Sequence, residues 1–304
     1  MLGARTETAV LGTVSEWALQ PQRRKVLDAF VRFCRRKPLG AVSLVVVVML
    51  IVVAALANVI APYDPTAPHY GALLKGPSLQ FLMGTDQMGR DLLSRIIFGS
   101  RISLYVGFVS VTLGVLHGAL WGAISGYFGG KVDQMIQRVM DALMAIPFLV
   151  LAMTIVAILG SSTRNVIIAL TIVFTPTTNR VVRGTVLAAK ENVYVDAAKV
   201  LGCRSWRIVT RHILPNVFAP ILVVATAYLG NAIIIEASLS FLGMGSPPPD
   251  ASWGAILSSE GRQFLERAPW IAVFPGAAIS IVVLSFNLLG DSLRDVLDPR
   301  LRTQ

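Results

Sequence analysis

Long apolar runs, separated by short polar or charged segments, dominate the pattern of this chain. The first covers residues 39–61 and reads LGAVSLVVVVMLIVVAALANVIA. Five further runs follow, at about residues 102–125, 141–159, 166–182, 213–241 and 270–289. Because about 20 apolar residues in a helix cross about 30 Å of hydrocarbon, the pattern predicts an all-α membrane protein with six transmembrane helices.

The composition agrees with a chain that is embedded in a bilayer. Hydrophobic residues make up 54% of the 304 residues and charged residues only 14%, and the mean hydropathy is +0.67. A soluble domain carries about 25% charged residues. The net charge of +10 would suit a nucleic-acid-binding protein, but the placement of the charges explains it better, so we expect a lipid bilayer and no nucleic acid as partner.

The segments between the apolar runs alternate between the two sides of the membrane, and lysine and arginine are unevenly divided between these two sets of segments. Seven lie in residues 62–101, 160–165 and 244–269, whereas twenty lie in residues 1–38, 126–140, 180–211 and 290–304. Positive charge favours the cytoplasmic side of a membrane. Both termini are therefore predicted to be cytoplasmic, with residues 1–38 as the N-terminal segment and residues 291–304 as the tail.

The segment at 62–101 is the longest one predicted to lie outside. It begins with a proline-rich connector, and its second half has the helical spacing of Leu92, Ile96 and Ile97. Asp86 is a candidate cap for such a helix. We therefore predict a short helix on the outer surface, before the second transmembrane helix.

The sequence contains no pattern that is typical of an enzyme. A phosphate-binding G-x-x-x-x-G-K-[ST] loop and a G-x-S-x-G nucleophile elbow are both missing, and the three histidines are scattered. We expect no catalytic, cofactor-binding or metal-binding residue. If the protein does energy-driven work, another subunit must hydrolyse the ATP.

One acidic residue lies deep inside a predicted span. Glu236, in NAIIIEASLSFLG, lies toward the outer half of the fifth apolar run. Intramembrane charge is costly and often functional, so Glu236 either lines a translocation cavity or pairs with a neighbouring helix. Asn231 and Ser238 in the same run are further candidate pathway or gate residues. An ion-coupled carrier is a remote alternative, because a chain of acidic groups across the membrane is missing.

The charged segment ENVYVDAAKVLGCRSWRIVTRHILPN, residues 191–216, interrupts the apolar pattern. Asp196 suits the first turn of a helix, Ala197 and Ala198 are small, and Gly202 ends or bends the helix. A second short basic helix, which includes Arg207, follows before Pro215 opens the fifth span. The pattern predicts a small helix–turn–helix that either docks in a groove of another protein or lies on anionic lipid.

This segment resembles the cytoplasmic EAA loop of ABC importer permeases, whose pattern is E-A-A-x3-G-x9-I-x-L-P. The matching positions are Asp196, Ala197, Ala198, Gly202, Leu214 and Pro215. Asp196 replaces the glutamate of the pattern, and His212 stands where the pattern has isoleucine. RHILPN is typical of the dipeptide/oligopeptide branch of these permeases.

Four longer blocks are similar to the second permease of that branch, the OppC/DppC type. They are GTDQMGRDLLSRIIFGSRISL, SGYFGGKVDQMIQRVMDALMAIP, EASLSFLGMGSPPPDASWGAIL and FNLLGDSLRDVLDPRL. The resemblance implies the type I ABC importer permease fold in a bacterial inner membrane. Residues 102–290 would form its core of five transmembrane helices, with a coupling loop at 184–212.

The resemblance also implies partners that this sequence does not contain. They are a second permease, two cytoplasmic ATPases that bind ATP and Mg²⁺, and an external solute-binding protein. The residues that would couple to an ATPase are Asp196, Ala197, Ala198, Leu201, Gly202, Arg207, Leu214 and Pro215. Di- or oligopeptides are the expected cargo, and nickel, glutathione or another small solute is the alternative.

Overall fold

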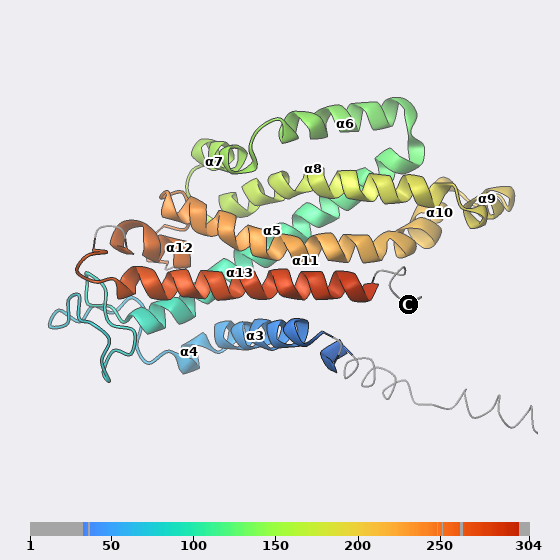
Figure 1. Ribbon diagram of the computed structural model, residues 1–304. Coiled ribbons are helices and arrows are strands. Elements are labelled where there is room, and N and C mark those ends of the chain that lie inside the picture. The colour runs from blue at the N-terminus through green and yellow to red at the C-terminus, as the bar shows by residue number, and fades with distance from the viewer. Residues whose placement is uncertain (1–32, 36, 248, 251, 262–263, 298–304) are drawn as a thin grey trace, which may run out of the picture.

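Four long helices form the body of the molecule. The computed structural model describes residues 33–297, except for residues 36, 248, 251 and 262–263. The long helices are α5 (Leu92–Phe128), α8 (Thr163–Lys190), α11 (Leu214–Phe241) and α13 (Trp270–Leu297). They lie side by side, and α3 (Pro38–Ala55) and α4 (Ala57–Ile60) run along one edge (Figure 1). No strand occurs among the described residues.

The remaining helices are short and lie near the ends of the body or along one edge of it. Helices α6 (Gly130–Met144) and α7 (Phe148–Leu159) follow α5, and α9 (Val193–Val200) and α10 (Ser205–Ile208) follow α8. A π-helical turn, Val209–Ile213, joins α10 to α11. Helix α12 (Trp253–Ala255) and the π-helical turn Ile256–Gly261 precede α13.

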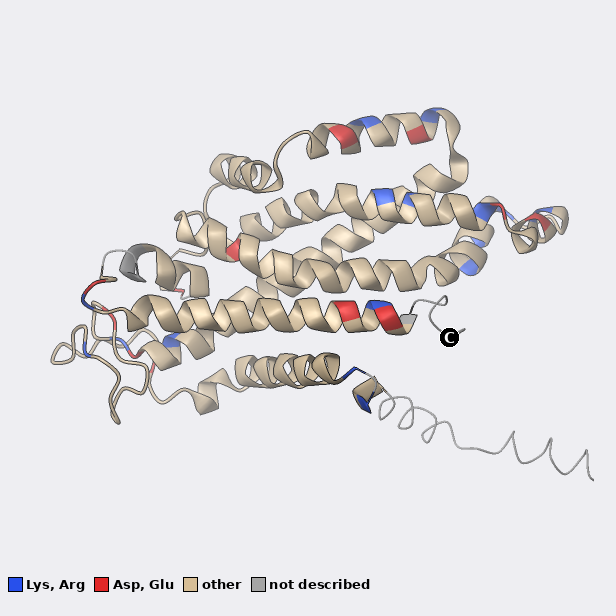
Figure 2. Ribbon diagram, in the orientation of Figure 1, with Lys and Arg blue, Asp and Glu red and all other residues tan. Residues whose placement is uncertain are grey.

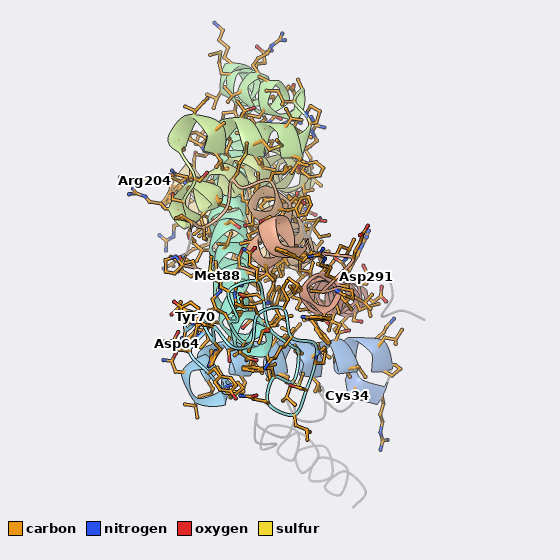
Figure 3. The ribbon with its side chains drawn as sticks, turned by 90° about the vertical axis from the view of Figure 1, so that its left-hand side faces the viewer. Cys34, Asp64, Tyr70, Met88, Arg204 and Asp291 are labelled. Carbon is orange, nitrogen blue, oxygen red and sulfur yellow. The ribbon has the colours of Figure 1, made fainter. Side chains whose placement is uncertain are left out.

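The body is a tall, narrow slab of helices. In the end-on view of Figure 3, α6 and α7 lie at one edge of the slab and α3 lies at the other. Charged residues gather toward the two ends of the long helices (Figure 2). Helix α3 begins and α13 ends at the end from which α9 projects (Figure 1), and Lys37 pairs with Asp295 there. This is the end to which the distribution of Lys and Arg assigns the cytoplasm.

Helices α5 and α8 pack closely because α5 carries a glycine at every fourth position, at Gly114, Gly118, Gly122 and Gly126. A Cβ atom added at Gly118 would lie 2.6 Å from the carbonyl oxygen of Thr175. One added at Gly122 would lie 2.7 Å from the carbonyl oxygen of Asn179. The small residues therefore allow the two backbones to touch, which is how helices associate in a bilayer.

The third predicted span is not one straight helix. Among the described residues, five helices are long and apolar enough to cross a membrane, and a sixth crossing exists if α6 and α7, which meet at an angle of 90°, form one broken span. The break lies at Pro147, which precedes the first residue of α7. Proline cannot donate a backbone hydrogen bond, and it disfavours helical geometry at the preceding residue.

Polar side chains fasten α6 to the body near its first turn. Arg183 of α8 donates from Nε to Oδ1 of Asp133 at 2.7 Å and from Nη2 to Oδ2 at 2.6 Å. Gln137 donates to Ser125 Oγ at 2.9 Å and to Asn179 Oδ1 at 3.0 Å. Helix α6 thus turns a polar face toward its own bundle, and the predicted third span, residues 141–159, corresponds to the last turn of α6, the break and the whole of α7.

The predicted short surface helix before the second span is also wrong. Helix α5 starts at Leu92 and continues without a break to Phe128. Its cap is Asp91, whose side chain accepts from the backbone N–H of Ser94 at 2.8 Å, and not Asp86. No proline interrupts the chain between Leu92 and Phe128, and Leu92 and Ile96 are buried in the core, so nothing ends the helix at the membrane surface.

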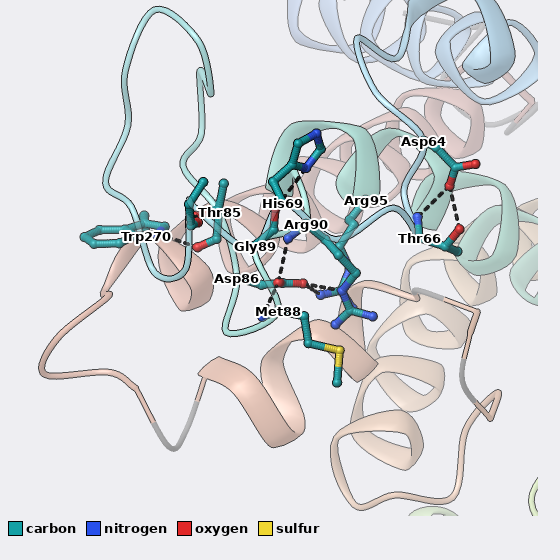
Figure 4. A network of polar contacts seen from close by, with 11 residues as sticks. Asp64, Thr66, His69, Thr85, Asp86, Met88, Gly89, Arg90, Arg95 and Trp270 are labelled. Atoms are coloured by element: carbon teal, nitrogen blue, oxygen red, sulfur yellow. Dashed lines mark hydrogen bonds and ion pairs between the residues drawn. The ribbon is translucent and has the colours of Figure 1, made fainter.

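Asp86 instead organises the outer lobe, residues 61–91, which has hardly any regular secondary structure. Its Oδ1 accepts from the backbone N–H of Met88 at 2.8 Å and of Arg90 at 2.9 Å, and its Oδ2 accepts from Arg90 Nε and from Arg95 (Figure 4). Trp270 of α13 donates to the carbonyl of Thr85 at 3.2 Å. The lobe is therefore fixed to both α5 and α13.

Helix α3 packs against the body along its length, with Val47 in the hydrophobic core, and polar contacts hold its two ends. At its outer end, Arg101 of α5 donates to the carbonyl oxygens of Ala54 and Ala55 and to the side chain of Asn58. A guanidinium is favourable there, because the last carbonyls of a helix carry partial negative charge. At the other end are the ion pair between Lys37 and Asp295 and the close approach of α3 to α13.

Candidate functional site

The α9–α10 segment, residues 191–213, projects beyond the end of the long helices (Figure 1). Lys190, the last residue of α8, donates to the backbone carbonyl of Tyr127 at 2.9 Å and lies over the Tyr127 ring. Helix α9 then runs for 8 residues. The contacts of Lys190 with Tyr127 therefore hold the start of the segment against α5, and the segment itself extends beyond the long helices.

Gly202 ends α9 as the sequence predicts. Its φ of +75° is left-handed, which favours glycine. The N–H of Cys203 donates to the carbonyl of Ala198 at 3.0 Å, and the N–H of Gly202 donates to that of Lys199 at 2.9 Å. These two bonds form a Schellman motif, which turns the chain sharply into α10.

The inner face of α9 packs on the start of α11. Val195 and Ala198 are buried in one cluster with Ile208, Ile213 and Val217. The sequence suggested that Ala197 and Ala198 together form a small face for a partner. In the structure, only Ala197 is exposed, whereas Ala198 is directed into the molecule. The inner face therefore couples the position of α9 to that of α11.

The outer face of the segment is apolar and uncovered. Val200 is 88% exposed, Leu201 82% and Trp206 65%, and Val193 is exposed as well. A cleft of about 470 Å³ opens beside them and is lined by residues 201–204, Trp206 and Arg207. The sequence pattern grouped Val200 with Val195 and Ala198 on one small apolar face and did not single out Val193, whereas the structure exposes Val200 and buries the other two. Val193 and Val200 both stand out of phase with the buried pair along the helix, which is the signal that could have identified them.

The segment is basic, and part of its charge is not balanced within the chain. Asp196 accepts from Lys199 at 2.8 Å, and this hydrogen bond raises the pKa of the Lys199 ammonium. Arg204 and Arg207 form no ion pair with any described residue, and Arg204 projects from the side of the molecule in Figure 3. The exposed face thus combines large apolar side chains with unneutralised positive charge.

Leu214 and Pro215, the last two residues of the sequence motif, form the first turn of α11. Leu214 packs against the buried cluster beneath α9, and Pro215 is exposed. Asn216 donates from Nδ2 to the carbonyl of His212 at 2.7 Å, which adds a bond next to the π-helical turn. The motif therefore occupies the junction between the projecting segment and a membrane-crossing helix.

Glu236 faces α5 and is not exposed to an open cavity. It is 2% exposed, and its two carboxylate oxygens accept from Ser103 at 2.9 Å and from Ser240 at 2.8 Å. Of the two predicted roles, this geometry favours pairing between helices. A buried carboxylate needs such partners because of the cost of leaving water.

Asn231 and Ser238 lie on a different side of α11. Asn231 is exposed and Ser238 is half-exposed, and both lie close to the helical position of the exposed Ile234. The hydroxyl of Ser238 donates to the carbonyl of Ile234 at 2.7 Å. The structure thus separates Glu236 from the other two candidates, which share a face that none of the described helices covers.

Comparison with known proteins extends over nearly the whole chain. A family described as binding-protein-dependent transport system inner membrane component matches residues 118–303, and the N-terminal TM domain of oligopeptide transport permease C matches residues 27–77. The dipeptide transport system permease protein DppC of Alkalihalophilus pseudofirmus is 42% identical, covering 91% of this chain and 90% of that protein. The glutathione transport system permease protein GsiD of Escherichia coli is 44% identical, covering 92% and 93%.

The fold is similar to that of a solved transporter. A chain from inward-facing conformations of the MetNI methionine ABC transporter aligns with a TM-score of 0.56 at 19% identity. The alignment covers 68% of the present chain and 98% of that one. At this identity, the likeness concerns the fold alone.

Proposed function

The chain belongs to the family of binding-protein-dependent transport system inner membrane components, and from this premise we propose that it is a permease subunit of an ATP-driven importer of short peptides. It forms the translocation pathway with a second permease. Two cytoplasmic ATPases bind ATP and Mg²⁺, and an external solute-binding protein delivers the cargo. The relatives that carry dipeptides and glutathione, itself a tripeptide, support this cargo class.

The observation that supports this proposal best is the two-faced α9–α10 segment. Its outer face offers Val193, Val200, Leu201 and Trp206 to a partner, and a helix with exposed apolar residues suits a groove on another protein. Arg204 and Arg207 favour a groove with an acidic rim, because complementary charge orients a complex. Asp196 lies in the first turn of this helix, Ala197 is a small exposed residue on it, and Gly202 ends it.

The inner face of the same segment gives the docked helix a mechanical connection. When the ATPases close or open, α9 is displaced, and the contacts of Val195 and Ala198 with Ile213 and Val217 carry the displacement to α11. Leu214 and Pro215 lie at that joint. Because α11 also bears the uncovered face with Asn231, a movement of α9 reaches the wall of the pathway.

The test replaces outer-face residues and measures ATPase attachment and transport separately. Val200→Asp and Leu201→Asp place carboxylates on the face that would enter the groove, and we expect loss of co-purifying ATPase and of ATP-dependent peptide uptake. Leu79→Asp is the matched control, since Leu79 is 99% exposed on the outer lobe at the opposite end of the molecule. Normal ATPase recovery and uptake in both cytoplasmic variants would refute this docking.

A further inference from the structure

A small pocket opens on the uncovered side of α11, between α7 and α8. Its volume is about 240 Å³. The lining includes Phe148 of α7, Phe174 and Thr177 of α8, and Tyr228, Asn231 and Ile234 of α11. Ligand pockets usually measure about 300–1,000 Å³, so this one suits one or two residues of a peptide and not a whole large ligand.

Asn231 indicates what this pocket faces. It is exposed, its side chain forms no hydrogen bond with a described residue, and it lies about 25 Å along α11 from Leu214 at 1.5 Å per residue. An amide in hydrocarbon without a partner is costly. The face that carries Asn231 is therefore turned toward water or toward protein, and not toward lipid tails.

The chemistry of the lining is aromatic and hydrogen-bonding but uncharged. Phe174 and Tyr228 stack with ring centroids 4.7 Å apart and planes inclined by 21°. The Asn231 amide provides donors and an acceptor. The Tyr228 hydroxyl is hydrogen-bonded to the side chains of Thr177 and Thr178, and each hydroxyl oxygen can form a further hydrogen bond. None of the described lining residues is an aspartate, glutamate, lysine, arginine, histidine or cysteine.

We propose that this pocket is a transient cargo site for the uncharged part of a peptide, and this proposal rests on the proposed function. The Asn231 amide and the Thr177 hydroxyl bind a backbone amide group of the cargo. The Phe174–Tyr228 stack receives one apolar side chain or the face of a peptide bond. Charged ends of the cargo stay outside the pocket, because its uncharged lining would not repay the loss of their hydration.

The same chemistry argues against a bare metal ion in this pocket. Ni²⁺ binds imidazole, thiolate or carboxylate ligands in preference to aromatic rings and hydroxyls. Among the described residues of the whole chain, no group of three His, Cys, Asp or Glu side chains could hold a metal ion. The pocket is therefore suited to peptides, including glutathione, and not to free nickel.

The test uses the complete transporter, with its second permease, ATPases and binding protein, in liposomes that contain ATP. Asn231→Leu removes the amide and keeps the branching and the number of heavy atoms of the side chain, and Thr177→Val removes the hydroxyl. We expect each to lower uptake of trialanine about 5–10-fold, the value of about one hydrogen bond, with unchanged assembly of the complex. Ser280→Ala is the control, because Ser280 is an exposed serine on α13, outside the pocket.

Two further measurements separate the alternatives. Trialanine with a methylated central nitrogen should show a smaller difference between the wild type and Asn231→Leu, because that backbone donor is missing from the cargo. Trialanine uptake by both variants within twofold of wild type would overturn the cargo site. Loss of the second permease from purified Asn231→Leu and Thr177→Val complexes would also overturn it and identify the pocket as a subunit interface.

Uptake by the wild-type complex separates a failure of the cargo pocket from a failure of the proposed peptide import. If the wild-type complex imports trialanine only with ATP, the variants test the pocket alone. If it imports none of a set of short peptides but does import Ni²⁺, both the peptide function and the peptide pocket are refuted. Ni²⁺ uptake that falls in Asn231→Leu would refute the assigned chemistry of the pocket.

Discussion

The close contact between α5 and α8 predicts a large effect of a single methyl group. Alanine at Gly118 would place its Cβ 2.5 Å from Thr178 Cβ and 2.6 Å from the carbonyl oxygen of Thr175. Ordinary contact begins at 3.4 Å, so the two helices would have to separate by roughly 0.9 Å. The backbone of α8 cannot yield as a flexible side chain would.

The magnitude follows from two opposing terms. Overpacking a tight interface costs about 1–3 kcal/mol, while alanine gains up to about 1 kcal/mol over glycine in helix propensity. Gly184→Ala in α8 is the matched control, because its Cβ would meet nothing within 4 Å. The propensity term cancels in the comparison, so Gly118→Ala should have a free energy of unfolding about 1–3 kcal/mol below that of Gly184→Ala.

The assay is the temperature at which half of the purified protein in detergent has aggregated. At about 2–4 °C per kcal/mol for a domain of 150–250 residues, the Gly118→Ala variant should aggregate roughly 2–12 °C below the Gly184→Ala variant. Equal temperatures for the two variants would refute the conclusion that backbone contact holds α5 against α8. A lower temperature for the control would refute it as well.

Three other predictions concern separate parts of the molecule. Gly202→Ala should reduce ATPase co-purification at least twofold, because alanine in this left-handed backbone conformation is strained by about 1 kcal/mol. Gly184→Ala is the control and should not reduce it. ATPase recovery with Gly202→Ala equal to that of the wild type would contradict the role of the turn. Arg183→Leu should destabilise the protein by about 1–3 kcal/mol by leaving the half-buried Asp133 carboxylate unpaired, and adding Asp133→Asn should restore part of the thermal stability; no restoration would show that charge pairing is not the cause. Glu236→Gln should keep most of the peptide uptake, because the amide oxygen accepts from one serine hydroxyl and the amide nitrogen donates to the other. Glu236→Leu should lose assembled protein on gel filtration, because both serines lose their partner; normal assembly of Glu236→Leu would remove its structural role.

Apolar runs predicted the membrane-crossing helices well wherever local patterning and packing agree. The runs at 102–125, 166–182, 213–241 and 270–289 all lie inside long helices of the structure. The turn at Gly202 was predictable for a similar reason, since a left-handed helix end needs glycine whatever surrounds it. These features depend on residues that are close together in the chain.

The errors arose where distant residues decide the structure. Helix α6 turns Asp133 and Gln137 toward α5 and α8. No local pattern contains their partners on α8, which are Arg183 for Asp133 and Asn179 for Gln137. The sequence gives no reason to distinguish Ala198 from Ala197, because the burial of Ala198 comes from its packing with Ile208 and Ile213. The pocket at Asn231 likewise depends on three helices, so the sequence supplied the asparagine but not its surroundings.

The attachment of α3 has a consequence for building chimeric permeases. The two family descriptions match residues 27–77 and 118–303, so the first span and the core correspond to separately recognisable modules. Arg101 lies between these two matches and holds the carbonyl end of α3, while Asp295 near the end of the core holds its beginning. An N-terminal module exchanged between relatives will thus dock only if the recipient core brings both attachment points with it.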